Sequence, residues 1–372
     1  MWKCVRKIID PMANVKSKKR IYICHTYYHA YVAVVKELVR GREHYGEADI
    51  VLSTLSNDFE SLDERLAAQG IFGHIYRYEE NDGSGSEEIR SHHSNKGNLV
   101  ANMLQRIRYT KLLGKLQEQF IPTDLSSYED IYVFCDSDPI GYYLNYKKLP
   151  YHALEDGLNS GKLDDQAYLA NKRAFGVKKL LSKMGLIFIE CGYSRYCIDY
   201  EVNDISANHN VPPNVIEVPR RELVSRLSDE DHDKIVHIFL EDADALAQKL
   251  KSAGDDKPYA MILTEPLCEL DVRKQLFGDV IDMYRDDHNI IIKPHPRDVL
   301  DYEKEFPDAI VIRGRFPMEV MNDMRTLKVD KLVSVITQID NVTFAKEKVY
   351  LGLDFLDKYE DPQIHRRLDS LM

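Results

Sequence analysis

The chain has 372 residues, of which 44% are apolar and 30% are charged, and it carries a formal net charge of −11. This composition is typical of a soluble globular protein, and the length favours two domains over one. The net negative charge argues against nucleic acid as a partner, although a chain of this charge can still carry a local basic patch.

The start of the chain lacks the long apolar core and the small-residue cleavage site of a signal peptide. Trp2, Val5, Ile8 and Ile9 would form one face of a short helix, and with the basic stretch 16–20 they could touch an anionic membrane surface. We favour the simpler interpretation, a frayed terminus. No apolar run approaches the ~20 residues that span a bilayer. We therefore expect a cytoplasmic protein, with peripheral contact at the inner face of the cell membrane as the alternative.

The six cysteines form no Cys-x-x-Cys pair and no cluster with histidine at the spacing of metal ligands. This pattern predicts reduced thiols and no structural zinc. We expect neither a cofactor nor a bound metal.

Short β-branched runs alternate with amphipathic stretches along the chain, and we find no internal repeat. This alternation predicts an α/β fold built on parallel sheets. Between the strands, apolar residues recur at helical spacing. The strands predicted in the first half are 20–25, 49–54, 71–78, 130–135, 151–154 and 186–190.

Two stretches interrupt this pattern. Residues 79–98 are polar and rich in glycine and serine, which predicts a mobile loop that is either a lid or decoration. Residues 202–220 contain two adjacent prolines and predict the approach to an interdomain linker, after which Ser228 caps a helix. The strands predicted in the second half are 259–263, 290–293, 309–313, 331–336 and 349–353.

We therefore predict two Rossmann-like domains, residues 1–215 and 216–372, with a last helix that could pack back on the first domain. Ligands of such sheets bind at the carboxyl ends of the strands and between the domains. Motifs at these strand ends are consequently the candidates for chemistry.

His295 directly follows a predicted strand and lies between Pro294 and Pro296. Each proline fixes its own φ and biases the residue before it away from helix, so the imidazole is positioned before a ligand arrives. Lys293 and Arg297 favour an anion nearby. A protonated histidine that faces a phosphate can give a proton to a leaving group. The alternative is a turn whose imidazole only satisfies a backbone carbonyl.

Glu155, Asp156 and Gly157 follow another predicted strand. Glycine permits a sharp turn that presents the two carboxylates at the edge of the sheet. Adjacent acids in a cleft raise one another's pKa, which suits a general base. An ordinary surface turn is the alternative.

Asp136 and Asp138 form an Asp-x-Asp pair after the predicted strand 130–135. In one large class of sugar transferases such a pair holds Mn²⁺ or Mg²⁺ against a nucleotide diphosphate. The alternative is that the two aspartates cap a helix that begins near Pro139, since proline favours the first helical turn.

Ser334 and Thr337 lie at the end of a predicted strand that leads into a helix. Hydroxyls, backbone N–H groups and the helix dipole could bind a phosphate there, although Ser and Thr at helix starts are often only caps. Glu319 follows a Gly-x-x-Pro turn and could accept hydrogen bonds from ribose hydroxyls. Thr264 is a further candidate on the nucleotide side.

These motifs, in this order, resemble those of bacterial sialyltransferases, which share a D/E-D/E-G motif, a downstream H-P motif and a final Ser/Thr motif. The chain is most similar to glycosyltransferase family 52, the lipooligosaccharide sialyltransferase family. The segments that carry the likeness are 23–33, 264–267 and 316–320, and the total length is also typical. One departure is that the final motif is often two adjacent serines, whereas this chain has Ser334-Val-Ile-Thr337.

The resemblance implies a GT-B fold, two Rossmann-like domains facing across a cleft, and an inverting, metal-independent reaction. The donor would be CMP-N-acetylneuraminic acid, a CMP-sialic acid, and the acceptor a surface glycan with a terminal galactose. A homodimer is also implied. The residues expected at the nucleotide are His295 as the acid, Ser334 and Thr337 at phosphate, Glu319 at ribose, the backbone near Arg313 and Gly314 at cytosine, and Thr264, Lys293, Pro296 and Arg297 around them.

The resemblance leaves the base open. Some branches of these enzymes assign it to the D/E-D/E-G motif, which points to Asp156 or Glu155. The lipooligosaccharide branch places an aspartate upstream of the H-P motif, and Asp271 is the candidate here. Three rival readings also stay open: a CDP-glycerol glycerophosphotransferase, a metal-dependent UDP-sugar transferase that uses Asp136 and Asp138, and a catalytically degenerate nucleotide-binding protein.

Overall fold

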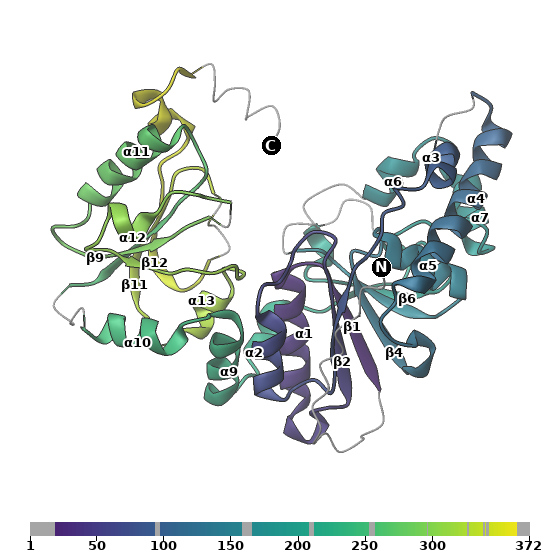
Figure 1. The fold of residues 1–372 in the computed structure, drawn as a ribbon, viewed down its shortest axis with the longest axis horizontal. Coiled ribbons are helices and arrows are strands. Elements are labelled where there is room, and N and C mark those ends of the chain that lie inside the picture. The colour runs from purple at the N-terminus through teal and green to yellow at the C-terminus, as the bar shows by residue number, and fades with distance from the viewer. Residues whose placement is uncertain are drawn as a thin grey trace. The chain divides into compact units, whose positions relative to one another are not determined.

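In the computed structural model, the chain divides into two compact units, Met1–Asp231 and His232–Met372 (Figure 1). Residues 216–231, which the sequence assigned to the second domain, belong to the first unit. The expected amphipathic start of the chain, the expected last helix and Pro296 lie outside the described residues. The structure describes residues 19–93, 97–157, 166–207, 212–252, 257–295, 297–325, 327–337, 339 and 342–362.

Unit 1 is built on a seven-stranded sheet with the strand order β3-β2-β1-β4-β5-β6-β7, and every pair of neighbours is parallel. Strands β1 and β2 are buried along their whole length, as expected of a parallel sheet covered on both faces. The strand order reverses between β1 and β4, which makes their carboxyl ends the switch point where such sheets bind ligands. The strands are β1 Arg20–Cys24, β2 Ala48–Ser53, β3 Ile75–Tyr78, β4 Asp130–Phe134, β5 Tyr151–Leu154, β6 Cys197–Val202 and β7 Val215–Glu217.

Helices cover this sheet, and the first of them begins at a clear cap, where the Thr26 side chain accepts a hydrogen bond from the N–H of His29. The stretch predicted as a mobile loop contains a helix, α3, because Ile89 is buried and two glutamates occupy the helix's first turn. The α-helices that begin in unit 1 are α1 Tyr27–Arg40, α2 Leu62–Gln69, α3 Glu87–His93, α4 Leu99–Leu116, α5 Pro139–Lys147, α6 Gln166–Asn171, α7 Phe175–Lys183, α8 Arg220–Val224 and α9 Asp229–Phe239.

The predicted strand 186–190 was wrong. Ile187, Phe188 and Ile189 are buried, but the segment pairs with no strand of the sheet. It packs instead against a small apolar cluster with Ala167 and Tyr193. A short apolar run has no periodicity that separates a strand from another buried segment. The sheet is extended by β6 and β7, which were not predicted.

Unit 2 contains a five-stranded parallel sheet with the order β10-β9-β8-β11-β12. Its core includes Leu276 and Phe277 of α11 packed on the strands. Ser228 caps α9 as predicted, since its hydroxyl oxygen accepts from the N–H of Asp231 at 3.2 Å. The elements are β8 Tyr259–Leu263, β9 Asn289–Lys293, β10 Ile310–Val311, β11 Val329–Ser334, β12 Ala345–Tyr350, α10 Ala243–Ser252, α11 Leu270–Asp282, α12 Tyr302–Glu305 and α13 Val320–Asp323.

None of the helices in the described part of the chain is long and apolar enough to cross a membrane.

Candidate active site

In unit 1, candidate residues gather where β1, β4 and β5 end. His25 follows β1, Cys135 and Asp136 follow β4, and Glu155 and Asp156 follow β5. These strands are neighbours around the switch point, so residues far apart in the sequence meet at one edge of the sheet.

Asp156 presents an ionised carboxylate at this edge. Its side chain is 64% exposed, yet its Oδ1 accepts hydrogen bonds from Nε2 of His29 at 2.8 Å and from the thiol of Cys135 at 3.0 Å. The hydrogen bond from His29 is the main reason that the pKa of Asp156 is lowered to about 2. The carboxylate is therefore charged at any ordinary pH and fixed in orientation.

His29 is the residue that orients Asp156, and sequence reasoning did not single it out. The imidazole is fully buried, stacks on Phe134 with ring centroids 4.5 Å apart, and has a pKa lowered by burial. Its Nδ1 accepts the backbone N–H of His25 at 3.0 Å, so the proton of the neutral ring is on Nε2, which faces Asp156. The ring therefore donates to the carboxylate without carrying a charge.

Glu155 has a different environment from its neighbour. Its side chain is buried, and Oε1 accepts the backbone N–H of Asn203 at 2.6 Å. This bond ties the end of β5 to the loop after β6. The geometry supports a structural role for Glu155 and leaves Asp156 as the accessible carboxylate of the pair.

The Asp-x-Asp pair is not presented as two accessible carboxylates. Asp136 is buried and accepts hydrogen bonds from the Tyr151 hydroxyl at 2.8 Å and from the N–H of Cys191 at 3.0 Å. Asp138 occupies the N-cap position of α5, but its side chain makes no capping bond. Glu80 takes that role by accepting the N–H of Ile140 at 2.6 Å.

One group of side chains in the described residues has the spacing of metal ligands: His29, Cys135 and Asp156, whose ligand atoms lie within 4.8 Å of one another. A metal-binding histidine normally donates its second ring N–H to a neighbour. In His29 the second nitrogen accepts instead, so the atom facing Asp156 carries a proton and not a free lone pair. The arrangement fits the positioning of a carboxylate better than a metal centre.

The buried Asp136 should make stability depend on pH. Burial raises its pKa from 3.8 to about 7, so the folded protein holds this proton more tightly than the unfolded chain. The stability that the protonated Asp136 contributes to the folded state is complete below the ordinary pKa of an aspartate, and it is lost as pH rises through about 7. We expect Asp136→Asn to gain stability relative to the wild type as pH rises from about 4 to about 7, measured by urea unfolding. Equal pH slopes of the unfolding free energy for the wild type and Asp136→Asn would contradict the assignment.

In unit 2, His295 follows β9 as predicted, in a loop that fixes its ring. Its N–H donates to Oγ1 of Thr264 at 3.3 Å, and its Nδ1 accepts the N–H of Arg297 at 3.1 Å. The proton of the neutral ring is therefore on Nε2. Burial, with Arg297 and Lys293 nearby, lowers the pKa of His295 despite the opposing effect of Asp298. The free protein thus presents a neutral Nε2–H donor.

A buried aspartate that sequence reasoning missed holds the His295 loop together. Asp298 accepts from Arg273 of α11 at 2.7 Å, from the hydroxyl of Thr264 at 3.1 Å and from that of Tyr302 at 2.7 Å. Its own N–H donates to the carbonyl of His295 at 2.8 Å. Thr264 therefore serves as a link between this aspartate and the His295 backbone.

Arg273→Met should destabilise the protein strongly. The Arg273 side chain is 8% exposed and that of Asp298 is fully buried, so removing the cation leaves an uncompensated buried carboxylate, which costs about 3–5 kcal/mol. Lys274→Met is the matched control, because Lys274 is 53% exposed in its ion pair with Glu305 and should cost under about 1 kcal/mol. Urea unfolding measures both. Equal losses of unfolding free energy in Arg273→Met and Lys274→Met would contradict this role of Arg273.

Lys293 and Gly314 form a second structural link near His295. Nζ of Lys293 donates to the carbonyls of Pro294 at 3.2 Å and Gly314 at 3.3 Å and lies over the ring of Phe316. Burial lowers the pKa of Lys293 to about 8. Gly314 has a φ of +99°, a conformation that glycine adopts without strain. Arg297, in contrast, is exposed and available to a ligand.

The predicted phosphate motif is held by a glutamate that sequence reasoning did not select. Oε1 of Glu265 accepts from the Ser334 hydroxyl at 3.1 Å and from the N–H groups of Ile336 and Thr337 at 3.3 and 3.0 Å. The Ser334 hydroxyl also lies 2.7 Å from the Thr337 carbonyl. Burial raises the pKa of Glu265. The loop is thus preformed, and its donors already face a carboxylate.

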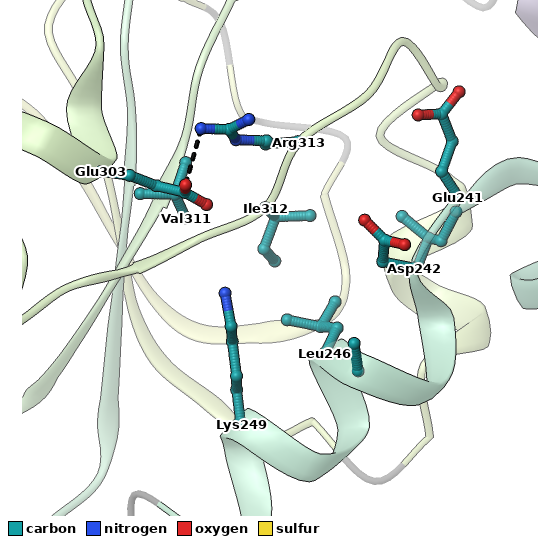
Figure 2. A pocket seen from close by; sticks show the side chains of 10 residues that line it. Glu241, Asp242, Leu246, Lys249, Glu303, Val311, Ile312 and Arg313 are labelled. Carbon is teal, nitrogen blue, oxygen red and sulfur yellow. Dashed lines mark hydrogen bonds and ion pairs between the residues drawn. The ribbon is translucent and has the colours of Figure 1, made fainter.

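The remaining candidates of unit 2 are separate from these networks. Asp271 is exposed in the first turn of α11. Glu319 precedes α13, and burial raises its pKa. Arg313 forms an ion pair with Glu303 at 2.6 Å beside a cavity that also faces Lys249 of α10 (Figure 2). That cavity measures about 80 Å³, well below the ~300 Å³ of an ordinary ligand pocket.

Unit 1 has a cavity of ligand size, about 700 Å³. Tyr109 and Tyr142 line it with rings at right angles, 5.6 Å between centroids. Glu190 also lines the cavity. The next residue, Cys191, donates its backbone N–H to the carboxylate of Asp136. Asp136 in turn follows Cys135, which binds Asp156. The cavity is therefore connected by chain and hydrogen bonds to the strand ends that carry Asp156.

Comparisons with solved structures describe the fold. A sialyltransferase from Photobacterium damsela is 14% identical, with 90% of this chain and 74% of that chain covered and a TM-score of 0.51. An alpha/beta-galactoside alpha-2,3-sialyltransferase from Photobacterium phosphoreum is 12% identical, with 90% of both chains covered and a TM-score of 0.48. At such identity the likeness concerns the fold alone, and it confirms the predicted α/β architecture of the GT-B type.

Comparisons of sequence give the family. A curated protein of Haemophilus influenzae, described as an uncharacterized protein, is 33% identical over 96 residues, which are 24% of this chain and 30% of that protein. The match therefore spans about a third of the relative's length. The model of glycosyltransferase family 52 matches residues 95–345, a range that includes Asp156, His295 and Ser334. The chain belongs to glycosyltransferase family 52.

Proposed function

We propose that the chain is an inverting, metal-independent sialyltransferase. It moves N-acetylneuraminic acid from CMP-sialic acid to a terminal galactose of a bacterial surface glycan. The observation that carries the proposal is a pair of preoriented groups in a family 52 chain: the Nε2–H of His295 and the ionised carboxylate of Asp156. Unit 2 would bind the CMP-sugar and unit 1 the acceptor.

His295 serves the leaving group. As the bond between the anomeric carbon and the phosphate oxygen breaks, negative charge grows on the phosphate, and a donor fixed beforehand stabilises that state more than the ground state. The phosphate also favours the protonated imidazole and so opposes the lowered pKa seen in the free protein. For this the ring must first take a proton from solvent on Nδ1, in place of the hydrogen bond from the Arg297 N–H. His295 can then donate its Nε2 proton to the departing CMP and return to the neutral ring, and exposed Arg297 adds positive charge.

Asp156 serves the acceptor. It takes the proton of the attacking hydroxyl as the new bond forms between the acceptor oxygen and the anomeric carbon, on the face opposite the leaving phosphate. A carboxylate with a pKa of about 2 is a weak base. It suffices here because the hydroxyl becomes strongly acidic only once its oxygen bonds to an oxocarbenium-like carbon. Exposure favours Asp156 over the buried Glu155, and the hydrogen bonds that orient its carboxylate favour it over the equally exposed Asp271.

Other partners follow from the same proposal. The 700 Å³ cavity of unit 1 offers two tyrosine rings and several amide groups, the kinds of surface that bind a sugar through an apolar face and a few fixed polar contacts. We place the galactose-terminated acceptor there. A homodimer is part of the proposal through the family resemblance alone.

A donor panel tests this function. The protein would be incubated with CMP-N-acetylneuraminic acid, CDP-glycerol or UDP-sugars, each with and without EDTA, and nucleotide release would be followed. We expect release from the CMP-sugar alone, unchanged by EDTA. Release of CMP from CDP-glycerol would favour the glycerophosphotransferase, and EDTA-sensitive release of UDP would favour the metal-dependent transferase. A thermal shift with CMP but no turnover of any donor would favour a binding protein.

A further inference from the structure

A second cavity of ligand size in unit 1 has a basic wall. It measures about 420 Å³, within the ~300–1,000 Å³ of pockets that hold small molecules. It lies where α1 and the turn after it meet α8 and the segment that follows α8. Four of the described residues of the wall are basic and none is acidic, which favours an anion. The lining residues are Lys36, Val39, Arg40, His44, Leu223 and Arg226.

This cavity is separate from the strand ends that carry Asp156. His29, near the start of α1, orients Asp156, whereas Arg40 is the last residue of the same helix. Arg40 comes 11 positions after His29, and a rise of ~1.5 Å per residue places the two residues about 16 Å apart along the helix axis. The basic cavity and the candidate active site therefore lie at opposite ends of α1.

Two arginines of the wall carry positive charge that the neighbouring carboxylates do not fully offset. Both oxygens of the buried Glu37 accept hydrogen bonds from Arg20 at 2.9 Å, so Arg40, at 3.4 Å from Glu37, shares a carboxylate that is already bound. The Arg40 side chain is 39% exposed. Arg226 is exposed and has no ion pair or side-chain hydrogen bond with the residues that the structure describes. Both arginines are therefore available to a ligand.

Behind the wall, a buried guanidinium has hydrogen-bonding groups without partners. Arg220 is 7% exposed, and its Nε and Nη2 have no partner in the described part of the chain. Its Nη1 lies 3.6 Å from Glu201, whose carboxylate binds Nζ of Lys36 at 2.6 Å. Burial is the main cause that lowers the pKa of Lys36, despite its ion pair with Glu201, and repulsion from Arg220 and Arg40 adds to it. An anion beside Lys36 would relieve this repulsion.

We propose that this cavity binds a small soluble anion that carries phosphate groups. Since Glu37 and Glu201 are each shared between two cations, Arg40, Arg220 and Arg226 supply surplus positive charge. A phosphate group carries about −1.5 to −2 at neutral pH. Planar guanidinium groups also match phosphate oxygens two at a time.

Charge and size decide among the possible anions. A single carboxylate would offset only one of the surplus cations, whereas one or two phosphate groups would offset most of them. His44 adds little surplus charge, because Glu47 lies 3.0 Å from its ring, so the arginines carry the recognition. The volume of about 420 Å³ suits a small molecule. The proposal depends neither on the donor nor on the acceptor of the reaction.

Equilibrium dialysis of the full chain against radiolabelled inorganic pyrophosphate tests the site, with CMP in excess so that a phosphate site for the nucleotide is already occupied. We expect one pyrophosphate per chain, bound less tightly as salt is added. Arg40→Gln/Arg226→Gln should raise the Kd at least about tenfold, because it removes charge-assisted hydrogen bonds, and Arg226→Glu should do the same. The matched control, Arg108→Gln/Arg195→Gln, removes two exposed arginines of the same unit and should bind as the wild type does.

Thermal unfolding checks that each variant folds. Because Arg226 is exposed, Arg226→Glu keeps the test decisive if the double variant does not fold. The proposal is overturned if the wild type binds no pyrophosphate, or if the control variant loses as much affinity as Arg40→Gln/Arg226→Gln. It is also overturned if phosphatidylglycerol vesicles displace the pyrophosphate, which would assign the cavity to a lipid headgroup.

Discussion

Replacing His295 by alanine is expected to lower the rate of sugar transfer at least ~10²-fold, the usual effect of removing a general acid. The loop fixes this ring from both sides, through the hydrogen bond from Arg297 to Nδ1 and the bond from the His295 N–H to Thr264. The alanine variant lacks the Nε2 proton, and it lacks the protonated imidazole that stabilises the negative charge growing on the phosphate. Because these interactions strengthen in the transition state, kcat should fall far more than KM rises.

Two variants make this result specific. His295→Gln retains an N–H donor but has no proton to transfer at neutral pH, so its rate should lie between those of the wild type and the alanine variant. His237→Ala removes an exposed histidine of the same unit and should leave kcat unchanged. Initial rates of CMP release measure all three. A His295→Ala enzyme within a few-fold of the wild type would exclude this residue as the acid.

Asp156→Asn is expected to have an effect of similar size, ~10²-fold or more on kcat. The asparagine retains the shape of the side chain and cannot take the acceptor's proton. Binding of CMP, followed by thermal shift, should be unchanged because the proposed nucleotide residues all belong to unit 2. The rate of the wild type should also show no loss from protonation of Asp156 at mildly acidic pH, because the pKa of this carboxyl is lowered to about 2.

The other candidates for the base serve as controls. Asp271→Asn alters an exposed carboxylate in the first turn of α11 and should leave kcat within a few-fold of the wild type. Glu155→Gln alters a buried side chain that binds the Asn203 N–H, so it should lower the melting temperature more than the rate. If Asp271→Asn abolished transfer and Asp156→Asn did not, the base would belong to unit 2 and the present assignment would be wrong.

Much of the fold was predictable because buried parallel strands are continuous apolar runs. The predicted strands 20–25, 49–54, 130–135 and 151–154 coincide with β1, β2, β4 and β5 to within a residue or two at each end. Edge strands are less visible. The strand β7 has only Val215, Ile216 and Glu217, none of them buried, so nothing in its pattern distinguishes it from a loop.

The chemistry-bearing residues were predictable where they follow a strand, as His295 and Asp156 do. Their partners were not. His29 and Asp156 are 127 residues apart in the chain, and Glu265 and Thr337 are 72 apart, so only the folded sheet brings them together. The sequence also does not distinguish exposed Asp156 from buried Glu155, since adjacent residues at a strand end point to opposite sides.

The most direct test of the central claim is the formation of sialyllactose from CMP-N-acetylneuraminic acid and lactose in the presence of EDTA. The account predicts one CMP released for each sialyllactose formed, at the same rate with and without the chelator. It is contradicted if EDTA abolishes transfer. It is also contradicted if the purified protein neither hydrolyses the donor nor shows a thermal shift with CMP, because both depend on unit 2 and on no particular acceptor.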